Sequence, residues 1–289
     1  MQPRHFLTQS NNLTSTVCTF SSHHQMNTSQ LSATDRLSPQ AEAALTNPDP
    51  VFQARLDLLS ALRWAQQEGL SEGVCNHFSV VVPGTTDRFL LNPQGLHWSE
   101  LTIGDLLIVD PQGARLEGKH EAEPTAFFIH SQIHMAKPTA RCVMHTHMPY
   151  ATALCCTQPG RLAWCSQNSL RYHGRIGYDD SYNGLAVDEA EGQRMAGLMA
   201  DSDILFLANH GVVVTAPDIP LAFDDLYYLE RACMIQVLAE STGKPLRIIP
   251  EELCQRTRQQ VSGEPQQSYL HMEAIKRILL KRHPEMLDE

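Results

Sequence analysis

Hydrophobic residues recur at helical spacing in several long segments of the chain. The first segment is residues 49–69, where Val51, Leu59 and Leu62 recur at helical intervals and Gly69 supplies a stop. Further helices are predicted over residues 124–137, from about residue 149, over 220–242 and over 266–287. The 124–137 segment begins with a proline, which is favoured in the first turn of a helix.

Short apolar runs bounded by turn residues predict strands between these helices. They cover residues 77–84, 88–95, 104–118, 140–147 and 203–217. The 104–118 run contains an Asp-Pro-Gln-Gly turn and is typical of a hairpin. Because strands and helices mingle along the chain without internal repeats, the pattern predicts one α/β domain.

The first part of the chain has a different composition. Residues 1–48 are rich in Ser, Thr, Asn and Gln, so they are predicted to form a flexible arm before a domain at 49–289 that ends in the C-terminal helix. Met26 is a second candidate start, and residues 1–25 would then be a start-site overcall. The segment lacks the apolar stretch of a signal peptide.

Charge and composition exclude several classes of function. The 22 Lys and Arg residues face 32 Asp and Glu residues, and the net charge of −10 argues against a basic face for nucleic acid. No run of about 20 apolar residues is present to cross a membrane. The eight cysteines include no CxxC pair, which is typical of a reducing compartment and predicts a cytoplasmic location.

Two histidines stand one residue apart in the segment MHTHMP, residues 144–149. Side chains alternate between the two faces of a strand, so His145 and His147 are expected on one face, as two ligands of one metal would be. Such a short pair also arises by chance, and alone it favours a metal only weakly.

A third histidine strengthens the metal hypothesis. His210 interrupts two apolar runs, and Gly211 after it is expected to let the backbone turn sharply. A buried histidine with a hydrogen-bond partner is the simpler interpretation. Three histidines nevertheless match the three-ligand plan of an open zinc site, and neutral imidazole also suits iron, cobalt and manganese.

Four motifs in this order resemble the class II aldolase/adducin family: EGVCNHFSV, LLNPQGLHW, MHTHMP and ANHGVVV. The resemblance covers about residues 51–243. It implies a three-layer α/β/α fold with a central mixed, mainly antiparallel sheet. It also implies one divalent ion, usually zinc, bound by His145, His147 and His210, and a homotetramer. In that family the ion stabilises an enediolate during carbon–carbon bond cleavage of a small carbonyl substrate.

The sequence departs from the aldolases of that family at two places. Their Ser-Ser-Glu segment, which holds a phosphate and moves a proton, falls on residues 124–126, so Ala126 replaces the glutamate. Cys75 replaces the glycine before Asn76. Asn76 and Gly95 are still expected in the pocket wall. The damaged phosphate site favours an unphosphorylated substrate. The sequence around Asn76 is more similar to the adducin branch of the family.

Glu123 is the candidate replacement for the missing glutamate. It lies just before the predicted helix at 124–137, where a carboxylate stabilises the helix dipole, and this is the favoured interpretation. A role as general acid or base at the metal is the alternative. His130 and His134 are four residues apart on that helix and are expected to pack against the sheet.

Three hypotheses follow for the function. The favoured one is a metal-dependent aldolase-like lyase that acts on a small hydroxy-carbonyl compound. The second is a non-heme iron oxygenase on the same scaffold, for which the lost glutamate matters less. The third is a non-catalytic, adducin-like metal-binding protein.

Overall fold

The computed structural model describes residues 36–185, 189–199 and 201–289, and for residues 124–128 it describes the helical backbone without the side chains. The predicted arm lies outside the described residues up to residue 35, and so does the start-site prediction for residues 1–25. The structure differs from the prediction after that point. Ser38 caps a helix α1 (Pro39–Leu45), whose Ala41 and Ala44 are buried. The folded part therefore begins before residue 49, and Leu37 and Leu45 of this segment pack against the core.

Within the described residues, eight strands form one sheet in the order β4-β3-β2-β1-β5-β8-β7-β6. Every neighbouring pair is antiparallel except β6 and β7, so the sheet is mixed and mainly antiparallel, as expected. The strands are β1 (His77–Val81), β2 (Phe89–Leu91), β3 (Leu107–Val109), β4 (Arg115–Glu117), β5 (Cys142–Thr146), β6 (Ile176–Asp179), β7 (Ile204–Leu207) and β8 (Gly211–Ala216).

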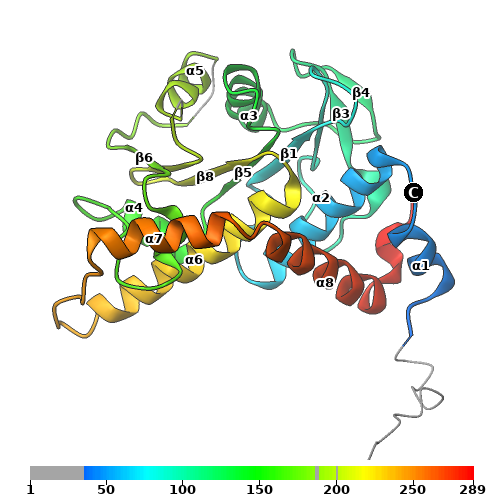
Figure 1. The fold of residues 1–289 in the computed structure, drawn as a ribbon. Coiled ribbons are helices and arrows are strands. Elements are labelled where there is room, and N and C mark those ends of the chain that lie inside the picture. Colours follow the sequence, from blue (N-terminus) through cyan, green and yellow to red (C-terminus); the bar gives the residue numbers. More distant parts are fainter. Residues whose placement is uncertain (1–35, 186–188, 200) are drawn as a thin grey trace, which may run out of the picture. The chain divides into compact units, whose positions relative to one another are not determined.

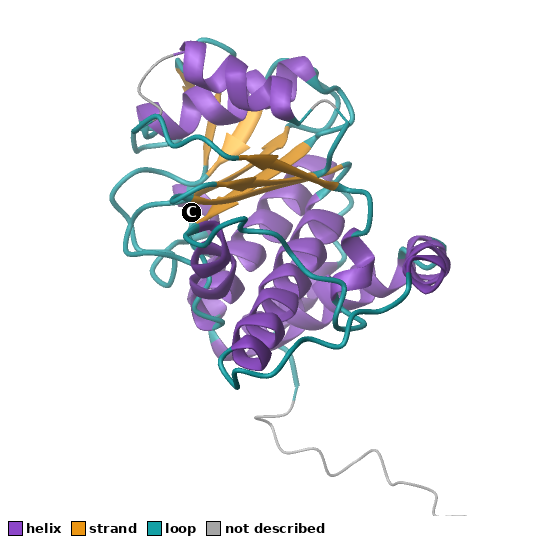
Figure 2. Ribbon diagram, turned by 90° about the vertical axis from the view of Figure 1, so that its left-hand side faces the viewer, coloured by secondary structure: helices purple, strands orange, loops and turns teal. Residues whose placement is uncertain are grey.

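Helices cover both faces of this sheet, which gives the expected three layers (Figure 1, Figure 2). One face carries α3 (Pro124–Ala136) and α5 (Glu189–Leu198). The other carries α2 (Pro50–Gln67), α4 (Pro149–Cys155), α6 (Ile219–Glu240), α7 (Glu251–Ser262) and α8 (Gln266–Arg282). The larger apolar core lies on this second side. No helix of the described residues has the length and apolar character that crossing a membrane requires.

The hydrophobic pattern located most of the helices and strands and missed three of them. Helices α2, α6 and α8 and strands β1, β5 and β8 fall in predicted segments. Strand β6 and helices α5 and α7 were not predicted. In α7 Cys254 is the single buried residue, and the twelve residues contain too few apolar side chains for the helix to be recognised.

Helix α3 places two histidines against β1, which confirms that this helix face packs on the sheet. Both imidazoles bond the hydroxyl of Ser79, His130 through Nδ1 at 2.7 Å and His134 through Nε2 at 2.8 Å. The other ring nitrogen of His134 donates to the carbonyl oxygen of Ala140 at 2.7 Å. Burial lowers the pKa of His134 to about 4 and holds the pKa of His130 well below its usual value. Both rings are therefore neutral at neutral pH.

We expect the free energy of unfolding to fall as the pH drops from 6.5 toward 4. Folded His134 stays neutral down to about pH 4, whereas in the unfolded chain it takes up a proton below 6.5. The unfolded state thus binds more protons in this window, so the contribution is fully present above pH 6.5 and is lost on acidification. When the pH is lowered from 7 to 5, the free energy of unfolding of His134→Gln should fall by about 2 kcal/mol less than that of the wild type. Urea unfolding with a chelator present measures this, and an identical pH dependence of the two proteins would contradict it.

Candidate metal centre

Three segments bring the predicted histidines together at the ends of the central strands. Strand β5 is antiparallel to both β1 and β8, so its end lies beside their starts. His145 is the fourth residue of β5, His147 follows the strand, and His210 lies in the turn between β7 and β8. His77, the first residue of β1, is the register partner of His145.

The three predicted ligands form a compact group. One ligand nitrogen from each of His145, His147 and His210 lies within 4.8 Å of the other two. The ring centroids are 4.8 to 5.0 Å apart. His145 is buried, whereas His147 and His210 are half-buried. The group could therefore hold a metal ion that a small molecule can reach from the side of His147 and His210.

Hydrogen bonds on the far side of two rings fix which nitrogen faces the centre. His145 Nδ1 lies 3.0 Å from the carbonyl oxygen of Val212, which can only accept, so this nitrogen carries the proton. His147 Nδ1 lies 2.6 Å from Glu72 Oε2 and donates to that carboxylate. In the neutral rings the lone pairs are then on the two Nε2 atoms, which lie 3.2 Å apart.

Two lone pairs at this distance repel each other unless a positive charge is shared between them. Either a second proton on His147 or a metal ion supplies that charge. The geometry fits a metal ion, because two imidazole ligands at tetrahedral angles and zinc–nitrogen distances of about 2.0–2.1 Å have their nitrogens about 3.3 Å apart. His210 lies close enough to both rings that it could be the third ligand.

Burial lowers the pKa of two histidines of the group. Burial, and then repulsion from His210 and His147, holds the pKa of His145 well below its usual value. Burial, and then repulsion from His147, lowers the pKa of His210 to about 4. Both side chains are neutral at neutral pH, and a histidine must be neutral to bind a metal.

Gly211 is required for close backbone packing rather than for the predicted turn. The predicted sharp turn at Gly211 is wrong, because Gly211 begins β8 and the left-handed residue of the turn is Asn209, with φ of 58°. A Cβ atom on Gly211 would lie 2.5 Å from the carbonyl oxygen of Thr146 and 2.9 Å from His147 Cδ2. A glycine is needed here because the backbone passes directly against the end of β5 and a ligand ring.

Glu72 is a site residue that the sequence reasoning missed. It lies in the loop before β1, and Asn76 shapes that loop. Asn76 has a φ of 76°, its Oδ1 accepts from the backbone N–H of Glu72 at 3.1 Å, and its carbonyl accepts from Asn92 Nδ2 at 3.3 Å. Asn76 thus supports the Glu72–His147 contact. The only signal in the sequence is that Glu72 opens the EGVCNHFSV motif.

The remaining predicted residues are Gly95 and Glu123. Gly95 has a φ of 81°, and a Cβ there would meet nothing within 4 Å, so its role is to form the turn. Glu123 is half-buried just before α3, and its charge raises the pKa of His77 against the larger effect of burial. The side chain of Ala126 lies outside the described residues. Neither role predicted for Glu123 is tested, so both stay predictions.

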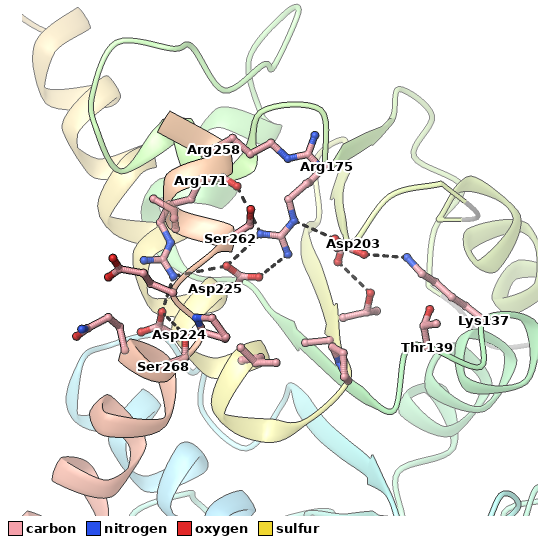
Figure 3. Close-up of a pocket in the computed structure, with 18 residues that line it drawn as sticks. Lys137, Thr139, Arg171, Arg175, Asp203, Asp224, Asp225, Arg258, Ser262 and Ser268 are labelled. Carbon is pink, nitrogen blue, oxygen red and sulfur yellow. Dashed lines mark hydrogen bonds and ion pairs between the residues drawn. The ribbon is translucent and has the colours of Figure 1, made fainter. Parts of the chain in front are cut away.

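A cavity of about 560 Å³ lies at the opposite end of β8 from the triad (Figure 3). Several of the charged side chains that line it pair with one another. Arg175 contacts Asp225 at 2.6 Å, and Lys137 contacts Asp203 at 3.1 Å. Among the described residues no group of side chains that could hold a metal lies here, and we assign no function to this cavity.

Comparison with known proteins places the chain in a family. Residues 56–237 match the description "Class II Aldolase and Adducin N-terminal domain". The chain therefore belongs to the class II aldolase and adducin family, which confirms the family predicted from the motifs.

Similar proteins carry both names. A protein of Pseudomonas aeruginosa described as an aldolase class 2 protein is 34% identical over 73% of this chain and 81% of its own length. An adducin-related protein of Schizosaccharomyces pombe is also 34% identical, over 68% of this chain and 61% of its own length. The crystal structure of an aldolase II superfamily protein from Pseudomonas syringae superposes with a TM-score of 0.75 and 31% identity, covering 86% of this chain and 96% of that one. The predicted fold is thereby confirmed.

We expect Glu72→Gln to weaken metal binding about tenfold, because the carboxylate holds the ring of His147 and increases the basicity of its Nε2. Competition against a chelating dye measures the affinity. Glu252→Gln, which changes an exposed glutamate in α7, is the matched control and should bind metal as the wild type does. Unchanged affinity in Glu72→Gln would show that this contact does not support the site.

Proposed function

We propose that the protein is a metal-dependent carbon–carbon lyase of the class II aldolase type, acting on a small hydroxy-carbonyl compound that carries no phosphate. The proposal includes zinc as the metal and a homotetramer as the assembly, both taken from the family resemblance. The observation that supports it best is the pair of Nε2 atoms of His145 and His147, 3.2 Å apart with their protons on the far nitrogens.

The residues of the chain divide the work. His145, His147 and His210 would hold the ion. A bound divalent ion supplies Lewis-acid polarisation of a carbonyl oxygen. The Val212 carbonyl and Glu72 orient two of the rings, so the ligand nitrogens are in place before the ion arrives. The half-buried edges of His147 and His210 leave the substrate a way in.

The residue that moves the proton is the open part of this proposal. Residue 126 is alanine, which has no proton to transfer. Glu123 remains the candidate, because its carboxylate acts electrostatically on His77, the register neighbour of His145. The missing Ser-Ser-Glu segment supports a substrate without phosphate, since the two serines are the groups that hold the phosphate in the family's aldolases.

A non-catalytic adducin-like role is the second candidate. The observation in its favour is that an adducin-related relative is as identical to this chain as an aldolase-named one. In that case the metal would stabilise the fold and no substrate would be turned over.

Metal analysis and a substrate screen together test the proposal. The full chain, purified without chelator, should carry one equivalent of divalent metal, whereas His145→Ala and His210→Ala should carry less than about a tenth, because two imidazoles hold a divalent ion poorly. His97→Ala, outside the triad, should keep its metal.

The metal-loaded wild type should then cleave a member of a panel of unphosphorylated hydroxy-keto acids and ketoses, and both triad variants should fall to background. Metal without activity on the whole panel would favour the adducin-like role. Absence of metal from the wild type would overturn both.

A further inference from the structure

Two buried histidines lie next to the triad, His77 on β1 beside His145 and His130 on α3. We propose that His130, together with His77, forms a binding site for one hydroxyl group at the inner wall of the centre, filled by a substrate hydroxyl or by a water molecule. This inference rests on the proposed function, because it adds a recognition point to the same site.

A chain of hydrogen bonds fixes the position of every proton up to His130. The Ala140 carbonyl only accepts, so His134 carries its proton on Nδ1 and the neutral ring presents a lone pair on Nε2. Ser79 must donate its single hydroxyl proton to that lone pair, at 2.8 Å. The Ser79 oxygen then accepts from His130 Nδ1 at 2.7 Å. His130 therefore presents a lone pair on Nε2.

That lone pair and the Nε2 atom of His77 are buried. His130 is 4% exposed and His77 is 5% exposed. In the part of the chain that the structure describes, the Nε2 atoms of both rings have no hydrogen-bond partner. A buried polar atom without a partner destabilises a fold by about 1–3 kcal/mol, so an occupant that bonds His130 Nε2 is favoured.

The position of the two rings connects them to the proposed catalytic chemistry. His77 pairs in register with His145, and its ring centroid lies 6.4 Å from that of His130, with the planes nearly perpendicular. His77 thus lies beside a triad histidine across the sheet, and its ring neighbours that of His130. Residue 126, the position of the family's glutamate, is one helical turn before His130.

The chemistry of His130 Nε2 selects a neutral hydrogen-bond donor. A carboxylate or phosphate oxygen offers no proton and would repel the lone pair. An ammonium group would lose its hydration in this buried place. A hydroxyl group is small and neutral and carries the proton that the nitrogen accepts.

A matched pair of probes tests whether the hydroxyl comes from a ligand. Glycerate and lactate share an α-hydroxy carboxylate and differ by one terminal hydroxyl. By calorimetry, the zinc-loaded full chain should bind glycerate about 5–10-fold more tightly than lactate, the size of one buried neutral hydrogen bond. His130→Phe should reduce that ratio to near one. His130→Gln, which keeps an acceptor oxygen, should retain part of the preference.

Nitrogen NMR of the zinc-loaded, ¹⁵N-histidine-labelled protein gives a readout that does not depend on probe binding. We expect His130 to carry its proton on Nδ1, and its Nε2 to accept a hydrogen bond. If glycerate shifts the Nε2 resonance and lactate does not, the hydroxyl belongs to the ligand. If Nε2 accepts a hydrogen bond without any probe and neither probe changes it, the hydroxyl belongs to water. Both outcomes support the site.

Two results would overturn the inference. One is a proton on His130 Nε2, and the other is an Nε2 resonance typical of an unbonded lone pair with and without glycerate. Ser79 orients His130 and does not itself contact the ligand in the proposed site. Ser79→Ala should therefore change which nitrogen of His130 carries the proton. The metal content of the same samples keeps the two proposals distinct. Full metal with a failed hydroxyl test contradicts only this inference, whereas loss of metal from the wild type contradicts the proposed function.

Discussion

Two imidazole lone pairs, on His145 Nε2 and His147 Nε2, are held 3.2 Å apart by hydrogen bonds on the far sides of their rings. In neutral rings this contact is repulsive, so the arrangement is stable only because the surrounding structure imposes it or because a cation relieves it. The partners that impose it are a main-chain carbonyl of β8 and a carboxylate from the loop before β1. The site is thus built from hydrogen bonds between segments that are far apart in the sequence.

The antiparallel sheet provides the framework for that constraint. Strand β5 lies between β1 and β8 and is antiparallel to both. The end of β5 therefore lies beside the starts of its two neighbours. Gly211 lets the β8 backbone approach the ring of His147 more closely than any side chain would permit. Helix α3 packs on the sheet at β1, where His130 and His134 bond Ser79. The same topology therefore sets both the triad and the buried histidines behind it.

Much of this could be predicted from the sequence, and particular residues show where prediction stops. The motifs identified the family, and with it the sheet type and the triad. Strand alternation explains His145, but His147 lies one residue beyond the end of β5, so the expected pairing on one strand face is only part of the reason. Glu72 contacts His147 from 75 residues away, and no local pattern indicates such a contact. The Ser79 contacts with α3 are likewise long-range, and α7 contains too few apolar residues to be recognised as a helix.

X-ray absorption at the metal edge, on full-length protein purified without chelator, tests the central claim most directly. The account predicts a nearest shell of about 2.0–2.1 Å with three imidazole nitrogens, no sulfur, and a remaining position occupied by a ligand from solvent. Sulfur in the nearest shell, or a shell filled entirely by protein side chains, would contradict an open three-histidine centre.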